Sequence, residues 1–136
     1  MKIYTGGTFD LFHWGHVQFL KNCAKLGEVV VSLNTDEFVF KYKKKFPIVQ
    51  FDERKIVVEA CRYVSSVVVN IGGADSKPAI EMVNPDTIAI GDDWRDKDYH
   101  SQMGFDQQWL DQRGISIVYL PYTQEISSTQ IRERMQ

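Results

Sequence analysis

The sequence has little of what would set it apart from ordinary globular proteins. It carries only two cysteines, Cys23 and Cys61, with no spacing typical of a metal site, so we expect reduced thiols rather than a disulfide framework. No apolar run is long enough to cross a membrane, and the chain opens on Lys2-Ile3-Tyr4 rather than on the apolar segment of a signal peptide. A formal net charge of −2 gives no overall attraction to nucleic acid or to an anionic membrane. We therefore expect a cytoplasmic protein with neither nucleic acid nor membrane as a partner.

Internal repeats, low-complexity tracts and linkers are also missing. With 136 residues, the chain is long enough for one substantial core and short for two. An apolar content of 43% and a charged content of 25% are ordinary for a folded domain. We therefore expect a single domain over residues 1–136.

Short apolar runs alternate with segments of helical periodicity. The runs read as strands at 3–4, 28–33, 66–71, 87–90 and 116–120. The helical segments lie at 17–26, 52–63, 78–83, 106–112 and 127–135, and a lysine-rich stretch ending near Pro47 reads as a flexible loop. This order predicts a Rossmann-like α/β domain: a five-stranded parallel sheet with helices on both faces and right-handed crossovers.

The most informative stretch runs from Gly6 to His16, between the first strand and the first helix. The free backbone N–H groups and the dipole of a helix N-terminus favour bound phosphate. His13 and His16, three residues apart at that helix start, can project toward one side and donate hydrogen bonds without a permanent charge. The alternative is a well-satisfied turn with two incidental histidines.

Other unusual clusters also follow strands. They are 34–36, 72–73, 91–94 and the stretch after Pro121. In a parallel sheet these positions share the carboxyl edge, where ligands bind at the reversal of strand order. The carboxylates of Asp92 and Asp93 could hold Mg²⁺ through water, bind a ribose or polyol hydroxyl, or cap the next segment. Ser127 or Ser128 could be a plain helix cap or could grip phosphates.

The basic block of Lys41, Lys43, Lys44 and Lys45 is open to two interpretations. Most charge runs are simply solvated. Because this one follows the second strand, it could instead close over phosphates and neutralise charge during group transfer.

Two motifs carry a resemblance to a known family. Gly7-Thr8-Phe9-Asp10-Leu11, followed by His13-Trp14-Gly15-His16, resembles the signature of nucleotidyltransferases with an H-x-G-H motif. Together with Gly91-Asp92-Asp93-Trp94, Leu120-Pro121 and Ile126-Ser127-Ser128-Thr129, the chain resembles the glycerol-3-phosphate cytidylyltransferase family from Ile3 to about Met135. The resemblance implies direct in-line attack of glycerol 3-phosphate on the α-phosphorus of CTP, giving CDP-glycerol and pyrophosphate, with Mg²⁺ and a homodimeric enzyme.

The resemblance also implies roles for individual residues. The catalytic residues would be His13, His16 and Lys43. The CTP site would be formed by Thr8, Phe9, Trp14, Gly15, Lys44, Asp93, Tyr122, Thr123, Ile126, Ser127, Ser128 and Thr129. The acceptor would be bound by Lys41, Lys77, Arg62 and Asp10, and no residue is assigned as a protein ligand of a metal.

The chain departs from the family pattern after Pro121. Where the family has Arg-Thr-x-Gly-Ile-Ser, this chain has Tyr122 in place of the arginine and Glu125 in place of the glycine. Losing a charge-assisted contact costs about 1.5–3 kcal/mol. The alternatives are therefore another small alcohol phosphate as acceptor, ATP in place of CTP, or a nucleotide-binding module that has lost catalysis.

Overall fold

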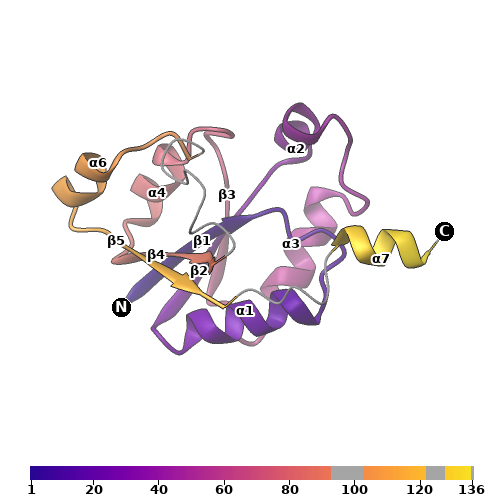
Figure 1. The fold of residues 1–136 in the computed structure, drawn as a ribbon, viewed down its shortest axis with the longest axis horizontal. Coiled ribbons are helices and arrows are strands. Elements are labelled where there is room, and N and C mark those ends of the chain that lie inside the picture. The colour runs from indigo at the N-terminus through magenta and orange to yellow at the C-terminus, as the bar shows by residue number, and fades with distance from the viewer. Residues whose placement is uncertain (93–102, 122–127, 136) are drawn as a thin grey trace.

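A five-stranded, all-parallel sheet forms the centre of the molecule. The computed structural model describes residues 1–92, 103–121 and 128–135, with the backbone alone for 128–130 (Figure 1). The strands are β1 (Lys2–Gly7), β2 (Glu28–Leu33), β3 (Ser66–Val69), β4 (Thr87–Gly91) and β5 (Ser116–Leu120). They lie in the order β3-β2-β1-β4-β5, so the direction of winding reverses between β1 and β4. The predicted parallel sheet is confirmed.

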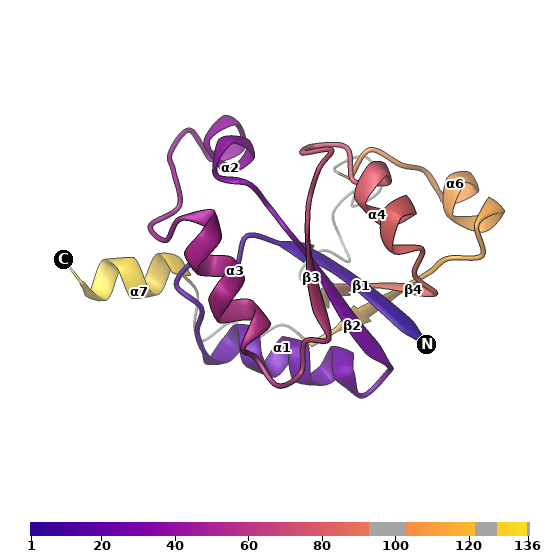
Figure 2. The same ribbon diagram turned by 180° about the vertical axis from the view of Figure 1, so that it is seen from behind.

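Helices cover both faces of this sheet, also as predicted. They are α1 (Trp14–Ala24), α2 (Asp36–Lys43), α3 (Phe51–Glu59), α4 (Lys77–Val83), α6 (Gln107–Gln112) and α7 (Ser128–Arg134). One face carries α1 and α3 and the other carries α4 and α6 (Figure 1, Figure 2). In both views α2 stands beyond the end of β2, and α7 lies at the periphery near the start of α3.

Alternation along the strands builds one core on each face. Ile3 packs with Phe19 and Leu20 of α1, whereas the next residue, Tyr4, packs with Ile80 and Leu110 on the other side. Successive side chains of a strand point to opposite faces, so continuous apolar strands are buried twice. The strands are therefore packed from both sides by the two helix layers.

The lysine-rich segment differs from the prediction. Instead of a loop, α2 begins after Thr35, whose Oγ1 accepts a hydrogen bond from the backbone N–H of Phe38 at 3.2 Å, and it continues through Lys43. It ends at Lys44, which has a left-handed φ of 63°. The loop prediction was wrong because the side-chain cap and the acids of the first turn outweigh the density of like charge.

The remaining sequence expectations have mixed outcomes. Helix α3 ends at Glu59, earlier than the predicted 63. Both thiols are free, and burial raises the pKa of Cys23 to about 12. Within the described ranges, no helix has the length and apolar character needed to cross a membrane. The stretches 93–102 and 122–127, which include Asp93 and Tyr122, lie outside the described residues.

Candidate active site

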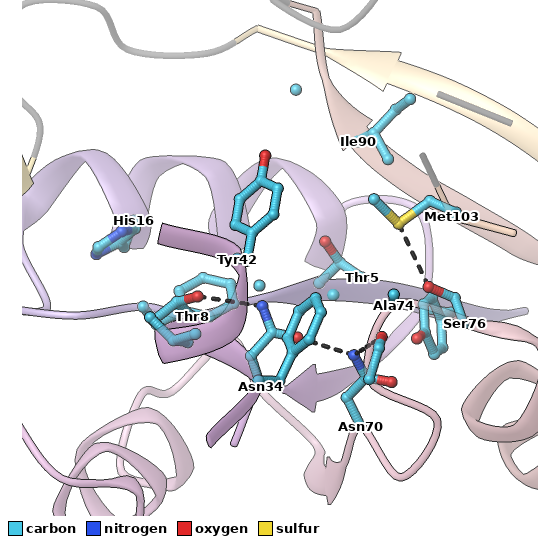
Figure 3. Close-up of a pocket in the computed structure, with 18 of the residues that line it drawn as sticks. Thr5, Thr8, His16, Asn34, Tyr42, Asn70, Ala74, Ser76, Ile90 and Met103 are labelled. Carbon is cyan, nitrogen blue, oxygen red and sulfur yellow. Dashed lines mark hydrogen bonds between the residues drawn. The ribbon is translucent and has the colours of Figure 1, made fainter. Parts of the chain in front are cut away.

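A cavity of about 350 Å³ opens at the carboxyl ends of β1 and β4. This is the reversal point of the strand order, where ligands of open α/β sheets bind. Its wall is formed by the end of β1 and the turn after it, the start of α1, one side of α2, and the residues that follow β2 and β3. Figure 3 shows His16 on one side of this cavity and Ser76 with Met103 on the other.

The turn between β1 and α1 has a constrained backbone. Phe9 and Leu11 have φ values of 52° and 51°, in the left-handed region that non-glycine residues seldom adopt. The ring of Phe9 lies against Gly7 so closely that a Cβ on Gly7 would be 2.9 Å from Phe9 Cε2. A side chain at position 7 would have to displace the Phe9 ring, and the turn directs the chain into the N-terminus of α1.

The two predicted histidines cap this helix as a pair. The backbone N–H of His13 donates to Nδ1 of His16 at 3.2 Å, and the N–H of Gly15 donates to Nδ1 of His13 at 3.1 Å. A neutral imidazole has one N–H, so a ring whose Nδ1 accepts carries its proton on Nε2. The rings stack with centroids 3.8 Å apart, and His13 Nε2 is buried without a partner among the described residues. Both histidines are thus set as Nε2–H donors.

Burial keeps these imidazoles neutral. It lowers the pKa of His16 to about 3, helped by neighbouring His13 and opposed by Asp10. Burial also lowers the pKa of His13 from its usual 6.5. At neutral pH the pair therefore offers hydrogen bonds without full charge.

Lys43 supplies positive charge to the cavity from α2. It is the one lysine or arginine among the described residues that line the cavity. Burial, Arg132 and Lys45 lower its pKa, while Asp10 raises it. A cation and the N–H donor of His16 on one cavity suit the oxygens of a polyphosphate.

Asp10, which was predicted to bind the acceptor, is engaged by other parts of this chain. Its side chain accepts hydrogen bonds from the N–H groups of Ile48 (2.8 Å) and Val49 (2.9 Å) and forms a 2.7 Å ion pair with Arg132 of α7. The residue is 4% exposed and does not line the cavity. Burial alone would raise the pKa of Asp10, but these contacts outweigh it and lower the pKa. Asp10 therefore ties three chain segments together beneath the site.

Arg54 is a residue that the sequence gave no reason to single out. It is 1% exposed, and its guanidinium donates to Thr8 O (2.8 Å), Val49 O (2.9 Å) and Asp36 Oδ1 (2.7 Å). A charged residue in the first turn of a helix is usually solvated, so burial here has no sequence signal. Arg54 fixes the backbone of the turn after β1.

A row of polar side chains joins Thr8 and the cluster at 34–36, both named from the sequence, to Asn70, which was missed. Asn34 Nδ2 donates to Thr8 Oγ1 at 3.1 Å, and Asn70 Nδ2 donates to Asn34 Oδ1 and to Gly73 O, both at 2.9 Å (Figure 3). All four residues line the cavity. The position of Asn70 directly after β3 is the signal that could have revealed it.

Several predicted residues lie outside the cavity wall. Trp14 is 56% exposed, and Lys41 and Lys44 are exposed on α2 and at its end. Nζ of Lys77 donates to Gly104 O at 2.9 Å, close beside the cavity residue Ser76. Arg62 is exposed on the turn before β3, so in the single chain it lies at the opposite edge of the sheet. Because α3 returns the chain to the amino ends of the strands, Arg62 is not part of the cavity wall of this chain, and its role at the site stays a prediction.

The other predictions divide by what the structure describes. Thr8, Phe9, Gly15, His16 and Lys43 line the cavity. Asp93, Tyr122, Thr123, Ile126 and Ser127 lie outside the described residues, and Ser128 and Thr129 are described only as the backbone that begins α7.

Comparison with known proteins agrees with this chemistry. A family model described as cytidylyltransferase-like matches residues 4–134. Glycerol-3-phosphate cytidylyltransferase of Bacillus subtilis (strain 168) is 38% identical over 135 residues, covering 98% of this chain and 96% of that protein. FAD synthase of Pyrococcus horikoshii is 42% identical over 94 residues, covering 68% of this chain and 64% of that protein. The crystal structure of the lipopolysaccharide core biosynthesis protein from Thermoplasma volcanium GSS1 has a TM-score of 0.70 and 25% identity, covering 90% of this chain and 96% of that one.

Proposed function

This chain belongs to the cytidylyltransferase-like family, and from that premise we propose that it transfers a cytidylyl group from CTP to glycerol 3-phosphate. The products are CDP-glycerol and pyrophosphate. The observation that carries the proposal is the pair of neutral imidazoles, His13 and His16, fixed as Nε2–H donors at a helix N-terminus, with His16 and Lys43 lining the same cavity. A relative named glycerol-3-phosphate cytidylyltransferase, alike over almost its whole length, supports the choice of substrates.

The reaction needs no covalent enzyme intermediate. A phosphate oxygen of glycerol 3-phosphate forms a bond to the α-phosphorus of CTP, and the bond from that phosphorus to the bridging oxygen breaks, releasing pyrophosphate. The protein then has to align two anions and stabilise the negative charge on the α-phosphoryl oxygens. The donors of His13 and His16 supply hydrogen bonds, and Lys43 offsets the repulsion between the two anions.

Mg²⁺ is proposed to enter with the nucleotide. No group of three or more histidine, cysteine or acidic side chains among the described residues is placed to hold a metal ion. Magnesium is commonly held by substrate phosphates with one or two carboxylates. When bound, the ion would neutralise phosphate charge, and no residue of the described chain is assigned to it.

The test is an assay of pyrophosphate release by the purified protein. With Mg²⁺, CTP and glycerol 3-phosphate we expect turnover, and we expect a loss on the order of 100-fold or more in His16→Ala with the fold retained. Turnover with another alcohol phosphate or with ATP, but not with this pair, would assign a different substrate. CTP binding without turnover on any acceptor would indicate a binding module.

The partial match to FAD synthase is the specific reason to include other acceptors and nucleotides in that assay. Homodimerisation and a cytoplasmic location are proposed on the family resemblance and the reduced thiols. Light scattering that gives the mass of one chain would contradict the dimer.

A further inference from the structure

We propose that Asn34 and Asn70 are positioning residues that direct the hydroxyl proton of Thr8 into the cavity, to be donated to a phosphate oxygen of the nucleotide. The inference rests on the proposed function only in requiring that a nucleoside triphosphate binds in this cavity.

The sheet itself places the three residues in a row. The backbone N–H of Asn34 donates to Gly7 O, and the N–H of Asn70 donates to Leu33 O, each at 2.9 Å. These bonds continue the parallel ladders past the last paired residues of β1, β2 and β3. The side chains therefore meet because of strand register, which does not change when a ligand binds.

A backbone carbonyl fixes the polarity of the row. Gly73 O can only accept, so the side-chain group of Asn70 that faces it must be the NH₂. The same NH₂ lies 2.9 Å from Asn34, which must then present its oxygen to Asn70 and its own NH₂ to Thr8. Turning the Asn70 amide over would bring its oxygen against two other oxygens. That repulsion explains why this 7% exposed side chain keeps its orientation although its Oδ1 has no partner among the described residues.

The hydrogen bonds of this row leave the Thr8 hydroxyl with one remaining role, that of a hydrogen-bond donor. Because its Oγ1 already accepts from Asn34 Nδ2, the single hydroxyl proton must point elsewhere. Among the described residues this proton has no acceptor. Arg54 holds the carbonyl of the same residue at 2.8 Å, so the backbone of Thr8 is also fixed. Figure 3 shows Thr8 on the cavity wall, on the side where His16 lies. The hydroxyl is therefore a third donor beside the imidazoles.

We call the chain of hydrogen bonds from Asn70 through Asn34 to Thr8 the relay. Asn34→Asp tests it with almost no change of side-chain shape. A carboxylate still accepts from Asn70, but it accepts from Thr8 as well and so draws the hydroxyl proton out of the cavity. Loss of one charge-assisted donor should lower kcat/KM for CTP, and the equilibrium affinity for Mg·CTP, by about 10- to 100-fold. Asn84→Asp adds the same charge at an exposed position after α4, far from the cavity, and serves as the control.

A double-mutant cycle separates the relay from the added charge. Asn34→Asp is measured in wild-type protein and in Thr8→Val, which has no hydroxyl to redirect. The relay predicts a loss from Asn34→Asp that is at least tenfold smaller in the Thr8→Val background, with the KM for the acceptor unchanged. Equal losses in both backgrounds would overturn it. If Asn34→Asp does not fold, as judged by circular dichroism, the same cycle is run with Asn34→Ala, where at least threefold coupling is expected.

The wild-type measurement distinguishes the two proposals. If the wild-type protein binds no Mg·CTP, the proposed function fails and the relay fails with it. If the wild-type binds Mg·CTP and every variant of the cycle binds it with equal affinity, only the relay is overturned.

Discussion

Replacing the buried guanidinium of Arg54 tests how the turn after β1 is held. Arg54→Met keeps an unbranched side chain but removes three hydrogen bonds of 2.7–2.9 Å, to Asp36, Thr8 and Val49. Breaking a buried ion pair by removing one partner costs about 3–5 kcal/mol. Because the side chain of Asp36 remains 25% exposed and can regain water, we take the lower half of that range, about 3–4 kcal/mol.

Urea unfolding followed by circular dichroism measures this cost. With a urea m-value of about 2 kcal/mol/M, the midpoint should fall by about 1.5–2 M. Arg62→Met is the matched control, because Arg62 is exposed on the opposite edge of the sheet, where its guanidinium carbon lies 6.0 Å from the centroid of the Tyr63 ring. Its free energy of unfolding should change by less than about 0.5 kcal/mol. If the midpoint of Arg54→Met falls by no more than that of the control, Arg54 does not hold the turn.

Three further outcomes are expected at the site. Lys43→Met should lower kcat/KM by about 100-fold. Lys41 lies outside the cavity wall, so the loss of kcat/KM in Lys41→Met should be at least tenfold smaller than in Lys43→Met. Equal losses in steady-state kinetics would contradict the assignment of Lys43 to the cavity. Because the folded pKa of His16 is about 3 and its usual value is 6.5, the unfolded chain binds more protons between these values, so stability is lost as pH falls below 6.5. At pH 4.5 the loss of stability is at most about 2.7 kcal/mol. Urea titrations should show a smaller loss in His16→Asn than in the wild-type protein over the same pH range. Asp10→Ala should destabilise the protein by about 3 kcal/mol by leaving Arg132 unpaired, and an unchanged urea midpoint would contradict that.

The sheet could be predicted because its strands are β-branched runs buried on both faces. The segments 28–33 and 116–120 match β2 and β5 without adjustment, since a continuous apolar run between polar turns has few other ways to be buried. The lysine-rich helix α2 was predicted as a loop because a run of like charges is typical of solvated segments, although Thr35 and the two acids after it are signals of a helix N-terminus.

The site was predictable as far as its residues share a short motif. His16 and Lys43 line one cavity, and His13 stacks against His16. The contributions of Arg54 and Asn70 depend on contacts between segments tens of residues apart, which no local pattern encodes. Asp10 lies inside the motif, but its structural role comes from its contacts with Ile48, Val49 and Arg132. Its place in the motif does not reveal these contacts.

The contacts of Asp10 also bear on the order in which the molecule folds. Its partners lie 38, 39 and 122 residues away along the chain. Closing such long loops costs entropy before any contact is gained, so these bonds form after the local helices and the first strand pairs. We therefore expect the Asp10 contacts beneath the cavity to form late in folding and to break early in unfolding. A nucleotide that binds only the completed cavity would then also lengthen the lifetime of the folded state.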